Sequence, residues 1–135
     1  MEYQEYLDRS EKASQLIRQG QYKEAVDVLF ELILSDLSDI DKAAQCVNIA
    51  IAYDRMGNSE EALSAYDKGI GYEQVYCRYD VAEKKVQYLT SLGRSKDAVP
   101  IYESLIKQPY MSEAEKMRMR KIIQTLLGKA MAQWK

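Results

Sequence analysis

Apolar residues recur along this chain with the spacing of one helix face, and they do so in three copies. Each copy has a glycine, four intervening residues and then an alanine that opens the apolar stripe; the pairs are Gly20 with Ala25, Gly57 with Ala62, and Gly93 with Ala98. The apolar positions that follow repeat at about 3.6 residues, the period of an α-helix. Because the glycines are 37 and 36 residues apart, the pattern predicts stacked helical hairpins, in which each unit buries its apolar face against a neighbour.

A second apolar stripe precedes the glycine of the middle copy. It consists of Cys46, Ile49, Ala50 and Tyr53. Gly57 is therefore predicted to end one helix and Asn58 to cap the next one, with Glu61 three residues later in the position of a capping box. In the same way, Ser38 is predicted to cap a helix that starts near Asp39. The middle copy thus consists of two helices joined by a short turn.

At these positions the middle copy resembles a tetratricopeptide repeat, a helix-turn-helix unit of about 34 residues. The family's small, aromatic and glycine positions are matched by Ala50, Tyr53, Gly57, Ala62 and Tyr66. Weaker forms of the pattern occur in the outer copies, at Ala13, Leu16, Gly20, Ala25 and Leu29 and at Val86, Leu89, Gly93, Ala98 and Tyr102. The resemblance implies an all-α fold, a right-handed superhelical solenoid of antiparallel helix hairpins with about seven helices. We expect a single domain over residues 1–135, with repeats at about 5–38, 39–72 and 73–109.

Three features depart from a regular unit. Each copy is slightly longer than the family's unit, and because no helix breaker occurs from Glu73 to Leu92 we assign the extra length to the first helices, each about a turn longer than usual. Pro100 lies inside the second helix of the third copy and predicts a kink or a late start there. A longer first helix would also bring Tyr72, Tyr76 and Tyr79 onto one face, at i, i+4 and i+7. Such a stripe would serve recognition or, as is more common, packing.

The last predicted helix covers residues 112–134. It follows Pro109 and opens with Ser112 and Glu115 at the spacing of a capping box. Its apolar side is formed by Met119, Ile122, Ile123, Leu126, Leu127, Ala130 and Trp134. We expect this helix to cover the exposed face of the third copy, as the end of a solenoid requires. Its opening, Met117-Arg118-Met119-Arg120, is also typical of an adaptable basic segment that binds a partner, because methionine side chains repack easily.

Charge is distributed unevenly along the 135 residues, although the net charge is only −2. Residues 1–75 contain fifteen acidic and seven basic side chains, a net charge of −8, whereas residues 76–135 contain six acidic and twelve basic ones, a net charge of +6. The basic part is either the solvated face of the last helix or a docking surface for an acidic partner or nucleic acid. A solvated face is the more common use of such charge.

The composition argues against catalysis. The chain has no histidine, so a general base that works near neutral pH would have to be a perturbed carboxylate, lysine or cysteine, and none occurs in a recognisable motif. Cys46 and Cys77 lack the spacing of a disulfide framework or a zinc site, and there is no glycine loop for phosphate. We therefore expect no enzyme activity, no cofactor and no metal. The acidic N-terminus and the absence of a long apolar run predict a cytoplasmic protein that does not enter a membrane.

The resemblance also implies where a partner binds. In tetratricopeptide arrays the first helices of successive hairpins line a concave groove that takes an extended peptide or a helix of another protein. Placed on this chain, the groove would include Ser14, Asn48, Ile51, Arg55, Lys84 and Gln87. We therefore predict a non-catalytic protein-interaction module that acts as an adaptor, a scaffold or a small chaperone.

Two other functions stay open from the sequence. The chain could form a homodimer or a larger homo-oligomer through the open end of the solenoid or the apolar last helix. Alternatively, the basic C-terminal segment could bind nucleic acid, although the net negative charge and the few aromatic side chains among its bases argue against this. Light scattering after size exclusion and a salt titration of nucleic-acid binding separate these functions from the first.

Overall fold

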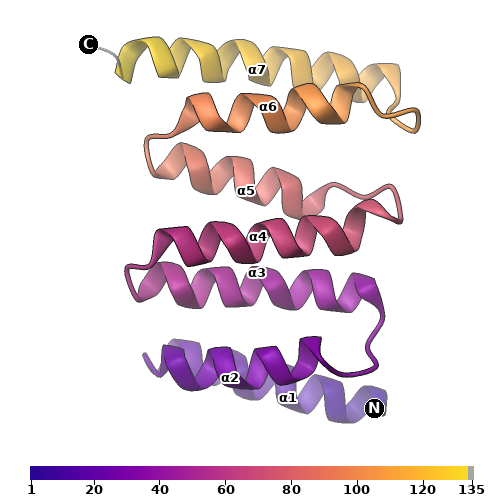
Figure 1. Cartoon of the computed structure of the whole chain (residues 1–135), viewed down its shortest axis with the longest axis vertical. Coiled ribbons are helices and arrows are strands. Elements are labelled where there is room, and N and C mark those ends of the chain that lie inside the picture. Colours follow the sequence, from indigo (N-terminus) through magenta and orange to yellow (C-terminus); the bar gives the residue numbers. More distant parts are fainter. Residues whose placement is uncertain (134–135) are drawn as a thin grey trace. The chain divides into compact units, whose positions relative to one another are not determined.

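Seven α-helices make up the part of the chain that the structure describes, residues 1–133 (Figure 1). In this computed structural model they are α1 (Tyr3–Arg18), α2 (Tyr22–Ile33), α3 (Asp39–Arg55), α4 (Ser59–Gln74), α5 (Asp80–Ser91), α6 (Ser95–Ile106) and α7 (Glu113–Gln133). No strand occurs in these residues, which confirms the all-α class and the helix hairpins expected from the sequence. The expected position of Trp134 on the last helix lies outside the described residues.

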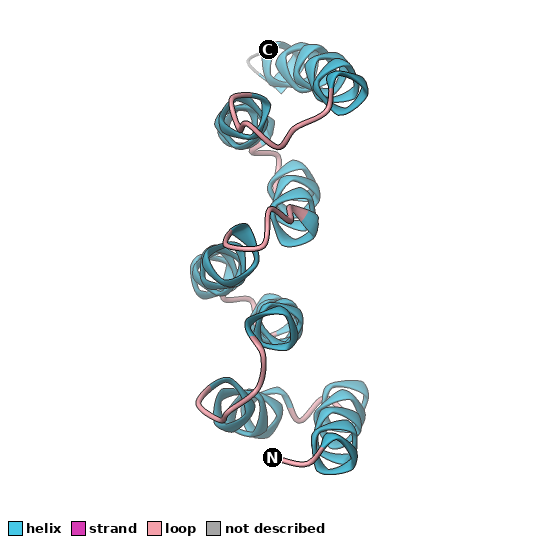
Figure 2. Ribbon diagram, turned by 90° about the vertical axis from the view of Figure 1, so that its right-hand side faces the viewer, coloured by secondary structure: helices cyan, strands magenta, loops and turns pink. Residues whose placement is uncertain are grey.

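The helices form two compact units, Met1–Val81 and Ala82–Lys135. In the first unit α1 packs against α2, α2 against α3 and α3 against α4, and α1 also contacts α3. Figure 2 shows these helices nearly end-on, with α1 and α3 on one side of α2 and α4. In the second unit α6 packs against α7. We call α1, α3 and α5 the first helices, because each opens a hairpin, and α2, α4 and α6 the second helices.

Glycine follows each first helix, as the sequence predicts for the middle copy. Gly20, Gly57 and Gly93 have φ of 79°, 76° and 74°, in the left-handed region that side chains with a Cβ rarely adopt. In each case the N–H of the next residue donates to the carbonyl five residues back, as Asn58 does to Tyr53 at 2.9 Å. This Schellman-type bond satisfies a carbonyl at the helix end and turns the chain back.

The predicted N-caps of α3 and α4 are confirmed. The Ser38 hydroxyl accepts the N–H of Asp41 at 3.2 Å, and α3 begins directly after it. The Asn58 side chain accepts the N–H of Glu61 at 3.5 Å, and α4 begins directly after Asn58. Each bond gives a partner to one of the free N–H groups of a first helical turn.

The first helix of the third copy is shorter than expected, and the prediction of a longer one is wrong. α4 extends over 16 residues, and α5 begins only at Asp80 and has 12. The break lies at Cys77, whose φ of 60° is in the left-handed region, and the N–H of Arg78 donates to the Glu73 carbonyl at 3.3 Å. Cysteine here occupies the position that glycine occupies at the ends of the first helices.

A buried carboxylate holds the start of α5. The Glu73 side chain is buried, and it accepts the backbone N–H of Val81 at 2.9 Å. The first turn of a helix has N–H groups without helical partners and the positive end of the helix dipole, so a carboxylate is stabilised there. Glu73 therefore gives a partner to one of the N–H groups in the first turn of α5.

The predicted tyrosine stripe is lost with the longer helix. Tyr72 lies on α4, whereas Tyr76 and Tyr79 lie in the turn before α5. The three rings therefore do not share one face of a helix, and this prediction is wrong.

Pro100 lies inside α6 but does not delay its start. α6 begins at Ser95, two residues after Gly93, and α2 and α4 begin at the same distance from their glycines, at Tyr22 and Ser59. The expected late start is therefore wrong, and a kink at Pro100 stays a prediction.

α4 packs closely against α3 because Gly69 has no side chain. A Cβ atom there would lie 3.0 Å from Val81 Cγ1, 3.1 Å from Cys46 Cβ and 3.3 Å from the Ala43 carbonyl oxygen. These distances are shorter than ordinary van der Waals contact, so an added methyl group would push the helices apart. At Gly71, also on α4, a Cβ would meet no atom within 4 Å.

We expect Gly69→Ala to lower the free energy of unfolding by about 1–3 kcal/mol, because overpacking outweighs the better helix propensity of alanine. The matched variant Gly71→Ala should raise it by up to about 1 kcal/mol, because only the propensity changes. Urea unfolding followed by far-UV circular dichroism measures both changes. A gain in stability for both variants would contradict the close contact at Gly69.

Replacing Cys77 by glycine should raise the free energy of unfolding by up to about 1 kcal/mol, because glycine adopts positive φ without steric strain. Cys77→Ala keeps the Cβ atom and should bring no such gain. Gly57→Ala should lower the free energy by about 1 kcal/mol through the backbone alone, since a Cβ there meets no atom within 4 Å. The urea assay compares the three variants, and equal stability of the glycine and alanine variants at position 77 would rule out strain there.

Candidate functional site

A buried glutamine of α3 forms hydrogen bonds to α1. The Gln45 side chain is 2% exposed, and its amide donates to the Tyr6 hydroxyl at 2.8 Å and to the Ser10 hydroxyl at 3.3 Å. The Asn48 amide donates in turn to Gln45 Oε1 at 3.0 Å. We call this set of bonds the Gln45 bridge. It gives partners to buried polar atoms and holds two helices in one relative position.

Four of the six predicted groove residues lie in the first unit, on α1 and α3, the two helices that the Gln45 bridge connects. Ser14 on α1 and Asn48 and Ile51 on α3 are half-buried, and Arg55 is exposed at the last position of α3. The spacing of α3 residues by three or four places Ala44, Val47, Asn48, Ile51 and Arg55 on one helix face. We call these residues, with Ser10 and Ser14 of α1, the first-helix face. It combines apolar groups with hydroxyl, amide and guanidinium groups.

The other two predicted residues, Lys84 and Gln87, lie on α5 in the second unit, and both are exposed. The structure therefore places Ser14, Asn48 and Ile51 on α1 and α3, two helices that contact each other, and it places Lys84 and Gln87 on a separate unit. A groove shared by all six residues stays a prediction.

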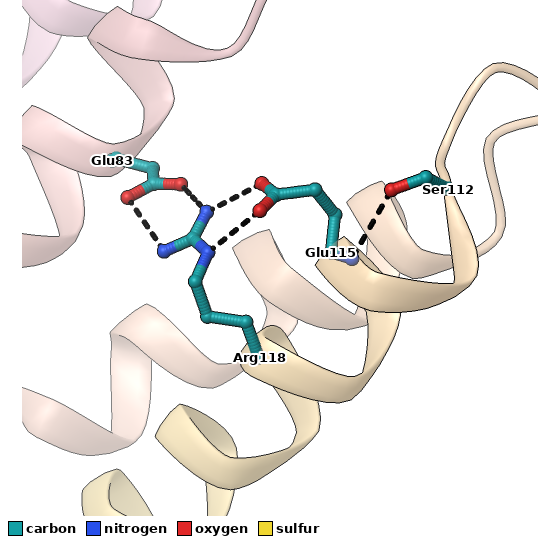
Figure 3. A network of polar contacts seen from close by, with 4 residues as sticks. All are labelled: Glu83, Ser112, Glu115 and Arg118. Atoms are coloured by element: carbon teal, nitrogen blue, oxygen red, sulfur yellow. Dashed lines mark hydrogen bonds and ion pairs between the residues drawn. The ribbon is translucent and has the colours of Figure 1, made fainter.

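An arginine network occupies the same second unit (Figure 3). The Arg118 guanidinium of α7 binds Glu83 of α5 through both carboxylate oxygens, with Nη1 3.3 Å from Oε2. It also binds Glu115 on its own helix, at 3.1 Å and 2.8 Å. These bonds to Glu115 and Glu83 raise the pKa of Arg118. The network fixes the first turn of α7, where the predicted cap is confirmed because the Ser112 hydroxyl accepts the Glu115 N–H at 3.2 Å.

The network changes the interpretation of the basic segment at the start of α7. Arg118 is engaged within the unit, and Met119 is fully buried. Met117 and Arg120 are exposed. Only the first and the last residue of the predicted partner-binding segment are therefore exposed to a partner.

A small hollow lies on the opposite side of the first unit, between α2, α3 and α4. Its volume is about 80 Å³, and it is lined by Phe30, Cys46, Ile49, Tyr53, Glu61, Ser64, Ala65 and Lys68. The Lys68 ammonium lies 5.6 Å from the centre of the Phe30 ring, a cation–π contact. A typical ligand site has at least roughly 300 Å³, so the hollow is too small to be one.

Neither thiol is placed for chemistry with a metal. Burial raises the pKa of the Cys46 thiol to about 11, so it is protonated at neutral pH. Within residues 1–133, no three cysteine, aspartate or glutamate side chains lie where they could share a metal ion. Over the same residues, no helix combines the length and the apolar character that crossing a membrane requires.

Sequence reasoning missed Gln45 and Glu83, the residues that connect the helices. Gln45 precedes Ile49 by four residues and Ala52 by seven, so it lies within the buried stripe of α3. A polar residue in an apolar stripe indicates a buried hydrogen bond, and this signal was present. Glu83 and Arg118 are 35 residues apart, so no local sequence pattern indicates that they pair.

The middle copy is similar to a known protein family. Residues 43–76 match the family model of the tetratricopeptide repeat. Over these residues the chain is similar to a tetratricopeptide repeat. The matched residues include most of α3 and all of α4, and the five positions on which the resemblance rests, from Ala50 to Tyr66, lie among them. No curated protein and no solved structure shows a significant match.

Tetratricopeptide repeats are protein-interaction modules, and the family is typically non-catalytic. The repeat of this chain contains both Gln45 and Asn48. The part of the first-helix face that belongs to α3 therefore lies within the matched repeat.

Tyr102 of α6 is buried and interacts with Glu83 and Arg118 of the arginine network. Burial, with a smaller effect of the Glu83 charge, raises the pKa of Tyr102 from 10.0 to about 12. The phenol of Tyr102 loses its proton at a higher pH in the folded chain than in the unfolded chain. Its contribution to the free energy of unfolding is therefore complete below pH 10 and is lost as the pH rises through 12.

We expect Tyr102→Phe to reduce the loss of stability above pH 10 by up to about 3 kcal/mol, because phenylalanine has no proton to lose. Urea unfolding at a series of pH values measures the slope for each variant. Tyr76→Phe, in which the substituted ring is exposed, controls for the removal of one hydroxyl group. Equal slopes in the wild type and Tyr102→Phe would show that this phenol does not contribute to alkaline unfolding.

Proposed function

We propose that this chain is a non-catalytic protein-interaction module that binds an extended peptide or a helix of another protein on the first-helix face. The observation that carries the proposal is the Gln45 bridge within and beside the tetratricopeptide repeat. It holds α1 and α3 in register and leaves the Asn48 side chain half-buried at the surface. A binding face that is ordered before the partner arrives loses less conformational entropy on binding.

The chemistry of the first-helix face suits a peptide. Val47 and Ile51 are half-buried and offer apolar contact, while Asn48 uses one amide hydrogen in the bridge and has a second donor and an acceptor. These can bond the N–H and C=O groups of a peptide backbone. Arg55 adds a positive charge at the end of α3. The face therefore offers apolar contact, backbone hydrogen bonds and one charge-assisted bond.

Lys84 and Gln87 offer an equivalent surface on α5 of the second unit. Both are exposed, and they stand one and four residues after Glu83, which Arg118 holds in place. We include them as a second contact area for the same partner. In this proposal the chain acts as an adaptor, a scaffold or a small chaperone, and its partner is another protein.

The test begins with a partner captured by the immobilised chain, identified and then produced on its own. We expect Asn48→Ala with Arg55→Ala to weaken its affinity at least about tenfold, since interface residues of this kind contribute 1 kcal/mol or more each. Isothermal titration calorimetry measures the change. Thermal unfolding checks that the variant is folded. We expect a modest loss of stability, because Asn48→Ala removes the bond to the buried Gln45 Oε1, whereas the Arg55 side chain is exposed.

Two further variants locate the binding surface. Glu24→Ala with Ser64→Ala removes exposed groups of α2 and α4 and should leave the affinity unchanged. Lys84→Ala with Gln87→Ala measures the contribution of α5. Unchanged affinity in the Asn48 and Arg55 variant, with a loss in the α2 and α4 variant, would move the site to the second helices.

A further inference from the structure

One side of α7 is an amphipathic surface that the described residues of the chain leave exposed. Along α7, residues spaced by three or four form a single face: Met117, Arg120, Lys121, Gln124, Leu127, Gly128 and Met131. We call this the α7 outer face. Met119 and Leu126 lie on the opposite side of the helix and are buried, on the side where α6 packs.

The apolar side chains of this face are well exposed. Met117 is 60% exposed, Leu127 47% and Met131 72%. Exposed apolar side chains that are scattered singly need no explanation, but three on one face of one helix are typical of a contact surface. Methionine is well suited to this, because its flexible side chain adapts to the shape of a partner.

The charges of the α7 outer face all have one sign. Arg120 and Lys121 lie between Met117 and Leu127, and Lys129 is exposed beside the face. After Glu115 there is no acidic residue up to Gln133. A partner that covers the apolar side chains must also approach these bases, and carboxylates would offset them.

From this complementarity we propose that the α7 outer face docks a helix of a partner protein that has apolar side chains on one side and glutamate or aspartate along its edges. Apolar residues of the docked helix lie against Met117, Leu127 and Met131, and its carboxylates meet Arg120 and Lys121. Gly128 has no side chain, and no atom of the chain lies within 4 Å of where its Cβ would be. The docked helix can therefore approach the backbone of α7 closely at this position.

Two other occupants fit the charges less well. A second copy of α7 would bring another set of bases to a face that already has no acid. An anionic lipid surface would attract α7 but would repel residues 1–75, which have a net charge of −8. An acidic helix matches both the apolar side chains and the bases. This site is independent of the first-helix face, since it lies in the other unit.

The test uses a fluorescein-labelled synthetic helix of the length of α7, with leucine on one side and glutamate at the flanking positions, and a matched peptide with lysine in place of each glutamate. Fluorescence anisotropy measures their binding to the full chain. We expect saturable binding of the glutamate peptide, weakened at higher salt, and at least about tenfold weaker binding of the lysine peptide.

Variants then locate the site. Arg120→Glu with Lys121→Glu, and separately Met117→Ser with Leu127→Ser, should each weaken binding at least about tenfold. Lys96→Glu with Lys107→Glu makes the same charge change at exposed positions on α6 and next to its end, and it should leave binding unchanged. Thermal unfolding checks that every variant is folded, which is expected because the substituted side chains are exposed.

Several outcomes would overturn the proposal. These are no saturable binding of the glutamate peptide, equal binding of the lysine peptide, or full binding by the variant with Arg120 and Lys121 reversed. Binding to phosphatidylserine vesicles without binding to the peptide would assign the face to membranes, and light scattering that shows α7-dependent dimers without peptide binding would assign it to self-association. Loss of peptide binding in the Asn48 and Arg55 variant alone would place the peptide on the first-helix face instead.

Discussion

The reversal of the chain after each first helix is the constraint on which the rest of the structure depends. A hairpin buries its apolar stripes only if the second helix returns along the first, and the positive φ of Gly20, Gly57 and Gly93 permits that return. The reversal always takes the same number of residues, so each second helix presents an alanine at the same point. Ala25, Ala62 and Ala98 are all fully buried. The spacing from glycine to alanine therefore reflects a turn of fixed geometry followed by a close contact of helices.

The elements with local chemical signals were predictable from the sequence. Gly57, Ser38 and Asn58 act through bonds to residues at most five positions away, and the structure has each where the sequence predicts it. The start of α5 was not predictable, because it depends on a cysteine in a conformation typical of glycine and on the carboxylate of Glu73. The site follows the same division. The family resemblance was sufficient to expect Asn48 and Arg55 on the outer side of a first helix, and the structure has Asn48 half-buried and Arg55 exposed. The bond from Gln45 to Tyr6, in contrast, depends on how α1 and α3 pack.

The two polar ties between helices differ in kind. The Gln45 bridge is uncharged and buried, so neither salt nor pH near neutrality weakens it directly. The tie between Arg118 and Glu83 is ionic and partly exposed, so it is screened by salt and contributes modestly to stability. The first unit thus keeps the relative position of α1 and α3 under conditions that loosen α5 from α7. This difference agrees with the proposal that the first-helix face is ordered before a partner binds.

The two cysteines lie in opposite environments, so thiol reagents can modify one of them selectively. Cys46 is buried with a thiol that stays protonated at neutral pH, whereas Cys77 is exposed in the turn between α4 and α5. Thiol reagents act on the accessible thiolate, so a dye or a spin label attaches selectively to Cys77 in the folded chain. That turn belongs neither to the first-helix face nor to the α7 outer face. A label there would report on the turn before α5 without occupying either proposed binding surface.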